Sequence, residues 1–147
     1  MRANYANLNQ LIKKIKNVDP SGENVQYLGF KKWEGILSQY NNADIFIFAS
    51  SCETFGQILS EAMSAGLPIA SSDRDPLPED LKDAGFYFNP EDITSKKTCL
   101  RYKITNPDLK KRLGTNSKQF SQNYSWKKSA DKTFAFLYNV YEKNKNE

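Results

Sequence analysis

The chain has 147 residues, the length of one domain, and its 39% apolar and 26% charged residues are typical of a folded globular protein rather than a disordered one. The net charge of +4 is modest, and the basic residues are not interleaved with aromatic ones as in proteins that stack nucleic-acid bases, so nucleic acid is not an expected partner. The chain contains no histidine, which excludes Cys–His and Ser–His catalytic pairs and most zinc sites.

The first third of the chain alternates between helical and extended patterns. Apolar residues at helical spacing predict helices over 5–17 and 33–41, and a turn at 19–22 precedes a short predicted strand over 25–28. Residues 44–49 are apolar without alternation. That pattern is typical of a strand that is buried on both faces of a parallel sheet.

The remaining segments continue the alternation and then become helical. A helix is predicted over 56–65, with Gly66 as its stop, and short strands over 67–71 and 86–88 flank a short helix that ends at Leu81. Further helices are predicted over 91–103, 107–122 and 125–143, the last two capped by Asn106 and Ser125. Strands that alternate with helices predict an α/β fold with a mostly parallel, Rossmann-like sheet.

The loop over 50–56 follows the most apolar strand, and ligands of open α/β sheets bind beyond the carboxyl ends of strands. The loop leads into a helix whose free N–H groups and partial positive charge suit a diphosphate. Two carboxylates, Glu53 and Glu61, could each accept hydrogen bonds from vicinal hydroxyls of a sugar. The structural alternatives are a helix-capping role for Glu53 and a plain surface position for Glu61.

The complete string from Asp44 to Ile69 resembles the E-x7-E signature of the family 4 retaining glycosyltransferases. In that family a buried strand precedes E-x-F-G, and a helix with the second Glu, a small residue, Gly, a spacer and Pro follow. Flanking segments over 24–30, 72–90 and 124–126 are also similar to family members, so the resemblance extends from about Leu8 to Tyr141.

The resemblance implies the C-terminal, donor-binding half of a GT-B fold. By analogy Glu53 is the catalytic-site acid, which faces the transferred sugar together with the backbone of its loop, and Glu61 holds the ribose hydroxyls. The turn after the 25–28 strand would border the base. The implied binding residues besides Glu61 are Thr54, Phe55, Gly56, Phe30 and Lys31. Lys31 could instead be a solvated lysine, Phe55 a core residue, and Arg74 with Asp73 either a sugar contact or a turn salt bridge.

By the same resemblance, the function is retaining transfer of a hexose from a nucleoside diphosphate sugar to a glycan or lipid-linked acceptor, as in polysaccharide biosynthesis. The transition state resembles an oxocarbenium ion that leaves a diphosphate, so preorganised donors carry the catalysis. The nucleotide sugar is the expected ligand, with no cofactor and no metal. A non-catalytic module that binds a nucleotide sugar or a protein is the alternative, and a flavodoxin-like or epimerase domain is a third candidate.

We expect residues 1–147 to form a single donor-binding domain that lacks the first βα unit of its fold. The N-terminal acceptor domain, its histidine and an Arg–Lys pair that grips the diphosphate have no counterpart, since Lys13 and Lys14 lie on a helix. The chain is therefore expected to be a fragment, inactive alone and prone to self-association, or else a stand-alone binding domain.

The expected compartment is the cytoplasm, because Cys52 and Cys99 suggest no disulfide framework. The denser basic stretch from Lys96 to Arg112 is either a solvated helical face or a surface that attracts phosphates or an anionic membrane. Peripheral contact with the inner membrane face is left open.

Overall fold

The computed structural model describes residues 5–145, apart from the side chains of residues 5, 6 and 102–104. The chain forms two compact units, one that ends at Leu37 and one that begins at Ser38. Helix α2 (Trp33–Asn42) begins in the first unit and ends in the second. That the two units act as the single predicted domain stays a prediction.

The first unit contains α1 (Tyr5–Val18) and a loop that is organised by the carboxylate of Asp19. This carboxylate accepts hydrogen bonds of 2.7 Å from the backbone N–H groups of both Asn24 and Val25, and these bonds lower the pKa of Asp19 to about 2. The strand predicted over 25–28 is wrong, because these residues have no regular secondary structure. A strand needs a hydrogen-bonded neighbour, and the regular structure of this unit is helical.

The second unit holds a parallel three-stranded sheet in the order β1-β2-β3, which confirms the predicted α/β class. Its strands are β1 (Phe46–Phe48), β2 (Ile69–Ser72) and β3 (Gly85–Phe88). The surrounding helices are α3 (Gln57–Ser64), α4 (Leu77–Leu81), the 3₁₀ helix η1 (Lys82–Ala84), α5 (Ile93–Ile104), α6 (Pro107–Ser121) and α7 (Trp126–Lys145).

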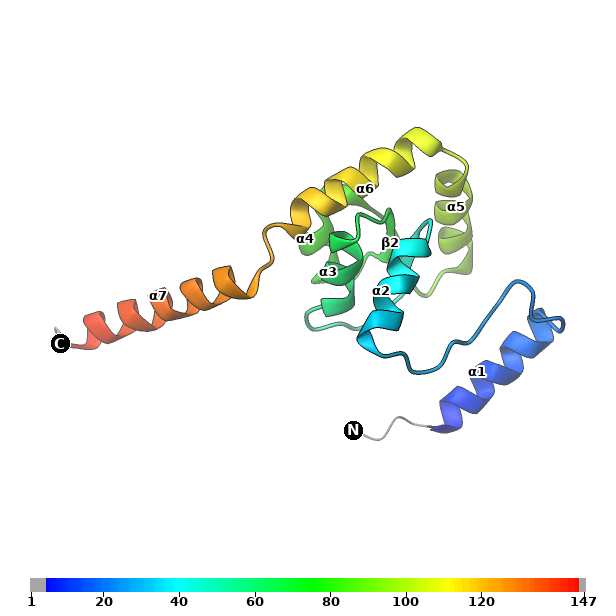
Figure 1. Ribbon diagram of the computed structural model, residues 1–147, viewed down its shortest axis with the longest axis horizontal. Helices are drawn as coiled ribbons and strands as arrows, with labels where there is room; N and C mark the ends of the chain where they lie inside the picture. Colours follow the sequence, from blue (N-terminus) through cyan, green and yellow to red (C-terminus); the bar gives the residue numbers. More distant parts are fainter. Residues whose placement is uncertain (1–4, 146–147) are drawn as a thin grey trace. The chain divides into compact units, whose positions relative to one another are not determined.

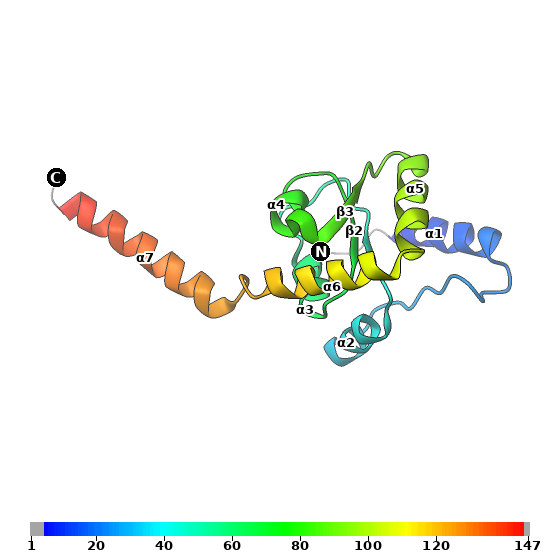
Figure 2. The same cartoon turned by 90° about the horizontal axis from the view of Figure 1, so that it is seen from above.

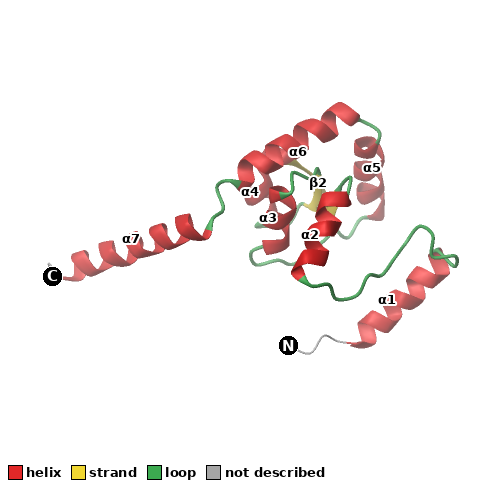
Figure 3. Ribbon diagram, in the orientation of Figure 1, coloured by secondary structure: helices red, strands yellow, loops and turns green. Residues whose placement is uncertain are grey.

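The core of this unit is centred on β2, whose four residues are all buried. Helices α4 and α5 lie on opposite sides of β2 (Figures 1 and 2), and Figure 3 shows how short the strands are beside the helices. The prediction that the 44–49 strand is buried on both faces is wrong, since the side chain of Ile47 is 46% exposed. Among the described residues β1 lies at the edge of the sheet, so its side chains are only partly covered by neighbouring elements.

Three predicted helix boundaries are confirmed by their hydrogen bonds. Gly66 has a φ of +74° and ends α3, with bonds from Gly66 N–H to the Met63 carbonyl and from Leu67 N–H to the Ala62 carbonyl. The Asn106 side chain accepts the Leu109 N–H at 3.0 Å at the start of α6. Ser125 caps α7 in the same way, through the Lys128 N–H at 3.1 Å.

Helix α7 forms as predicted, but no residue in it is buried, and several of its aromatic side chains are exposed. Among the described residues, no helix combines the length and the hydropathy that crossing a lipid bilayer requires.

Candidate functional site

The candidate site lies where β1 ends and α3 begins, as parallel-sheet topology predicts. Gly56 stands at the junction as the N-cap of α3, with a φ of 64° in the left-handed region. A Cβ added to Gly56 would lie 3.0 Å from Leu77 Cδ2 and 3.7 Å from Glu53 Cγ. Both the backbone conformation and the close packing of α4 therefore favour glycine at this position.

The carboxylate of Glu53 folds back onto the backbone of its own loop. Its Oε1 atom accepts the Thr54 N–H at 2.9 Å and the Phe55 N–H at 3.4 Å. The amides of Thr54, Gly56 and Phe55 together lower the pKa of Glu53. Consecutive amides in the loop that ends at the N-cap of α3 are thus directed at one negative charge, which here belongs to the protein.

Glu61 lies further along α3 and is half-buried. Its Oε2 atom accepts a 3.0 Å hydrogen bond from the hydroxyl of Tyr40, near the end of α2. Burial raises the pKa of Tyr40 to about 12, and the charge of Glu61 adds to this effect. Glu61 therefore has a specific hydrogen-bond partner, Tyr40. A plain surface glutamate would have none.

Arg74, in the loop after β2, connects this loop to the one that follows β3. Its guanidinium lies 3.1 Å from the Asp73 carboxylate, donates to Asn89 Oδ1 at 3.3 Å and forms an ion pair with Glu91. Arg74 lowers the pKa of Glu91, and a hydrogen bond from the Ser51 hydroxyl contributes. The turn salt bridge considered for Arg74 and Asp73 is present, and it belongs to a network that reaches the candidate loop.

Phe30 and Lys31 lie in the first unit, which ends at Leu37. Both residues are exposed, Phe30 to 94%. Their contact with a nucleotide base stays a prediction.

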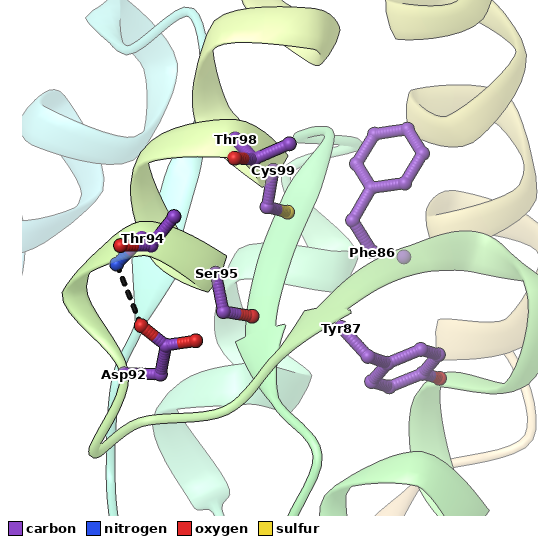
Figure 4. Close-up of a pocket in the computed structure, with 8 residues that line it drawn as sticks. Phe86, Tyr87, Asp92, Thr94, Ser95, Thr98 and Cys99 are labelled. Carbon is purple, nitrogen blue, oxygen red and sulfur yellow. Dashed lines mark hydrogen bonds between the residues drawn. The ribbon is translucent and has the colours of Figure 1, made fainter.

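Two hollows of the second unit lie away from the Glu53 loop. One, of about 590 Å³, lies between β3 and α5 and is lined by residues such as Phe86, Tyr87 and Thr98 (Figure 4). The other, of about 570 Å³, includes Tyr40, Gly66 and lysines of α6. Neither hollow is lined by Glu53, Glu61 or the amides between them. In the described part of the chain, His, Cys, Asp and Glu side chains form no cluster that could hold a metal ion.

Sequence reasoning missed two contributors to this region, Tyr40 and Ser51. The helical spacing of apolar residues predicts the helix over 33–41 that contains Tyr40, but spacing carries no information on where a hydroxyl points. Ser51 was included only as part of a polar loop. No pattern in the sequence signals its contact with Glu91, which is 40 residues away.

Comparison with known proteins gives a consistent family. The sequence pattern of the family described as glycosyl transferases group 1 matches residues 4–120. A sulfoquinovosyl transferase of Arabidopsis thaliana is 29% identical over 111 residues, which are 72% of this chain and 22% of that protein. An uncharacterized glycosyltransferase of Methanocaldococcus jannaschii is 31% identical over 126 residues, 81% of this chain and 35% of that protein.

An O-antigen chain mannosyltransferase B of Escherichia coli is 27% identical over 109 residues, 74% of this chain and 29% of that protein. Among solved structures, a sucrose-phosphate synthase of Thermosynechococcus elongatus aligns with a TM-score of 0.80 at 20% identity, over 90% of this chain and 34% of that one. The chain thus spans between about a fifth and just over a third of the length of these proteins.

Proposed function

The chain belongs to the glycosyl transferases group 1 family, with the Rossmann-like fold of a C-terminal GT-B domain, and on that premise we propose that it binds the nucleoside diphosphate sugar of a glycosyltransferase. The observation that carries the proposal is that the Thr54 and Phe55 amides, just before the Gly56 N-cap of α3, both donate to one negatively charged group. Successive amides of a loop that leads into a helix stabilise a phosphate for the same electrostatic reason that they stabilise this carboxylate.

The proposed reaction is transfer of a hexose to a glycan or lipid-linked acceptor with retained anomeric configuration. The three amides would hold the diphosphate and stabilise the charge that develops on it as the glycosidic bond breaks. Glu53 would then leave these amides and face the transferred sugar. Its carboxylate can accept hydrogen bonds from the hydroxyls of that sugar. Glu61 would hold the ribose hydroxyls.

The nucleotide sugar is the only small molecule that the proposal requires, and we expect transfer by the complete enzyme to be insensitive to EDTA. Because the chain spans a minor part of its relatives, catalysis also needs the companion GT-B domain that bears the acceptor. Turnover by the 147-residue chain alone is expected to be undetectable, and supplying the companion domain should restore it. Nucleotide-sugar binding without restored turnover would favour the non-catalytic module.

The binding test is a titration of the chain with UDP-, GDP- and ADP-sugars, followed by the amide resonances of Thr54, Phe55 and Gly56. We expect weak, saturable shifts for one base, and a clear loss of affinity in Glu61→Ala. Glu79→Ala is the matched control, because Glu79 is exposed on α4 and its side chain is outside the contacts described above. If every nucleotide sugar leaves the three amides unmoved at millimolar concentration, the proposed donor site is refuted.

A further inference from the structure

The hydroxyl of Tyr40 is held in place by packing of its aromatic ring. Tyr40 is 9% exposed, and its ring meets the ring of Phe46 edge-on, with centroids 5.9 Å apart and planes at 65°. Phe46 in turn stacks on Phe48 of the same strand at 6.1 Å. The ring of Tyr40 is buried against these half-buried phenylalanines, and such an edge-to-face contact restricts its rotation, so the hydroxyl has a defined position.

This fixed hydroxyl donates a hydrogen bond to one of the two carboxylate oxygens of Glu61. Oε2 accepts the Tyr40 O–H at 3.0 Å, whereas Oε1 accepts no hydrogen bond from the described residues. A free glutamate side chain on a helix samples several rotamers, and ordering it upon ligand binding costs entropy. The Tyr40 hydrogen bond already orders the Glu61 side chain before a ligand binds, and it leaves Oε1 available to that ligand.

We propose that Tyr40 is a positioning residue for the donor nucleotide, whose hydroxyl orients Glu61 so that Oε1 meets the ribose hydroxyls. This inference rests on the proposed function, which assigns the ribose to Glu61. The raised pKa of Tyr40 is consistent with it, because the phenol stays protonated and remains a donor across the physiological pH range. A purely structural role, in which the bond only ties α2 to α3, makes a different prediction.

The test compares nucleoside diphosphates with their 2′-deoxy forms, which differ only in a ribose hydroxyl. For the base that the wild-type chain binds best, we expect the ribose form to bind about 10-fold more tightly, as for a hydrogen bond to a charged group. In Tyr40→Phe, which removes only the hydroxyl, affinity for the ribose form should fall and the ratio should approach 1. Affinity for the 2′-deoxy form should hardly change. A structural tie would lower both affinities equally.

Tyr87→Phe is the matched control, because the Tyr87 hydroxyl is also hydrogen-bonded but donates to the Lys82 carbonyl, outside the Glu61 contact. It should leave the ratio at its wild-type value. A second measurement avoids reliance on the fold of the variant. In the wild-type chain, the side-chain carboxyl resonance of Glu61 and the ring resonances of Tyr40 should shift with the ribose form and not with the 2′-deoxy form.

The outcomes separate the two proposals. If the wild-type chain binds nucleotides but does not distinguish ribose from 2′-deoxyribose, the assignment of the ribose to Glu61 fails, and the role of Tyr40 fails with it. If the wild type distinguishes them and a folded Tyr40→Phe keeps the same ratio, only the inference about Tyr40 is overturned. Unmoved Tyr40 and Glu61 resonances during ribose-specific binding would overturn it as well.

Discussion

The closest backbone approach that we can test by mutation lies between α6 and the end of α3, the helix that carries Glu61. A Cβ added to Gly114 would lie 2.5 Å from the carbonyl oxygen of Gly66 and 3.7 Å from Cδ of Pro68. Gly66 itself has a φ of +74° and sits in the hydrogen-bonded cap of α3. The obstructing atom is therefore part of a constrained backbone and cannot turn away as a side chain would.

Two opposing effects set the magnitude for Gly114→Ala. Alanine is favoured over glycine inside a helix by about 1 kcal/mol. Since Cβ contacts below 3.0 Å essentially do not occur, α6 and the α3 cap must separate by at least about 0.5 Å. Overpacking a well-packed interior costs roughly 1–3 kcal/mol, and a backbone obstacle favours the upper end. We therefore expect a net loss of about 1–2 kcal/mol, a fall in Tm of roughly 4–8 °C.

The assay is thermal and urea unfolding followed by circular dichroism. The matched control is Thr115→Ala, the next residue of α6, whose side chain is exposed; it should change the free energy of unfolding by less than about 0.5 kcal/mol. The reasoning would be refuted if Gly114→Ala proved as stable as the wild type or more stable, because helix propensity would then outweigh the predicted collision.

Further predictions concern two carboxylates and one buried hydroxyl. The Asp19 contact should stabilise the 19–25 turn above about pH 4 and be lost as the pH falls towards its pKa of about 2. The exchange of the Val25 amide with solvent, measured relative to the intrinsic exchange rate at the same pH, should therefore lose its protection there. In Asp19→Asn this protection should be reduced at neutral pH too. Because the pKa of Glu53 lies below its ordinary value of 4.5, the chemical shift of the Thr54 amide should change with pH only below that value. Glu53→Gln is the control and should show no such change. A pH-independent Thr54 shift in the wild type would contradict the contact. Ser117→Ala, which deletes a buried 3.2 Å hydrogen bond to a carbonyl of η1, should cost roughly 1 kcal/mol in urea unfolding, whereas an unchanged midpoint would show that the bond contributes nothing.

Local signals in the sequence predicted much of the second unit. The strand before the 50–56 loop, the stop at Gly66 and the caps at Asn106 and Ser125 each depend on residues within about five positions of one another, and all occur in the structure, although the strand is less buried than its apolar run predicts. The carboxylates Glu53 and Glu61 were found in the same way, since strand-loop-helix order determines which loop lies at the carboxyl end of the sheet.

The tertiary structure decided what depends on contacts between distant segments. The 25–28 run has the composition of a strand, but backbone groups form a strand only when another strand pairs with them. The bond from Tyr40 to Glu61 depends on how α2 and α3 pack, and the Arg74 network depends on where two strand-end loops meet. Helical and strand periodicity specify which face of an element is apolar, but not which polar atom across that face lies within 3 Å.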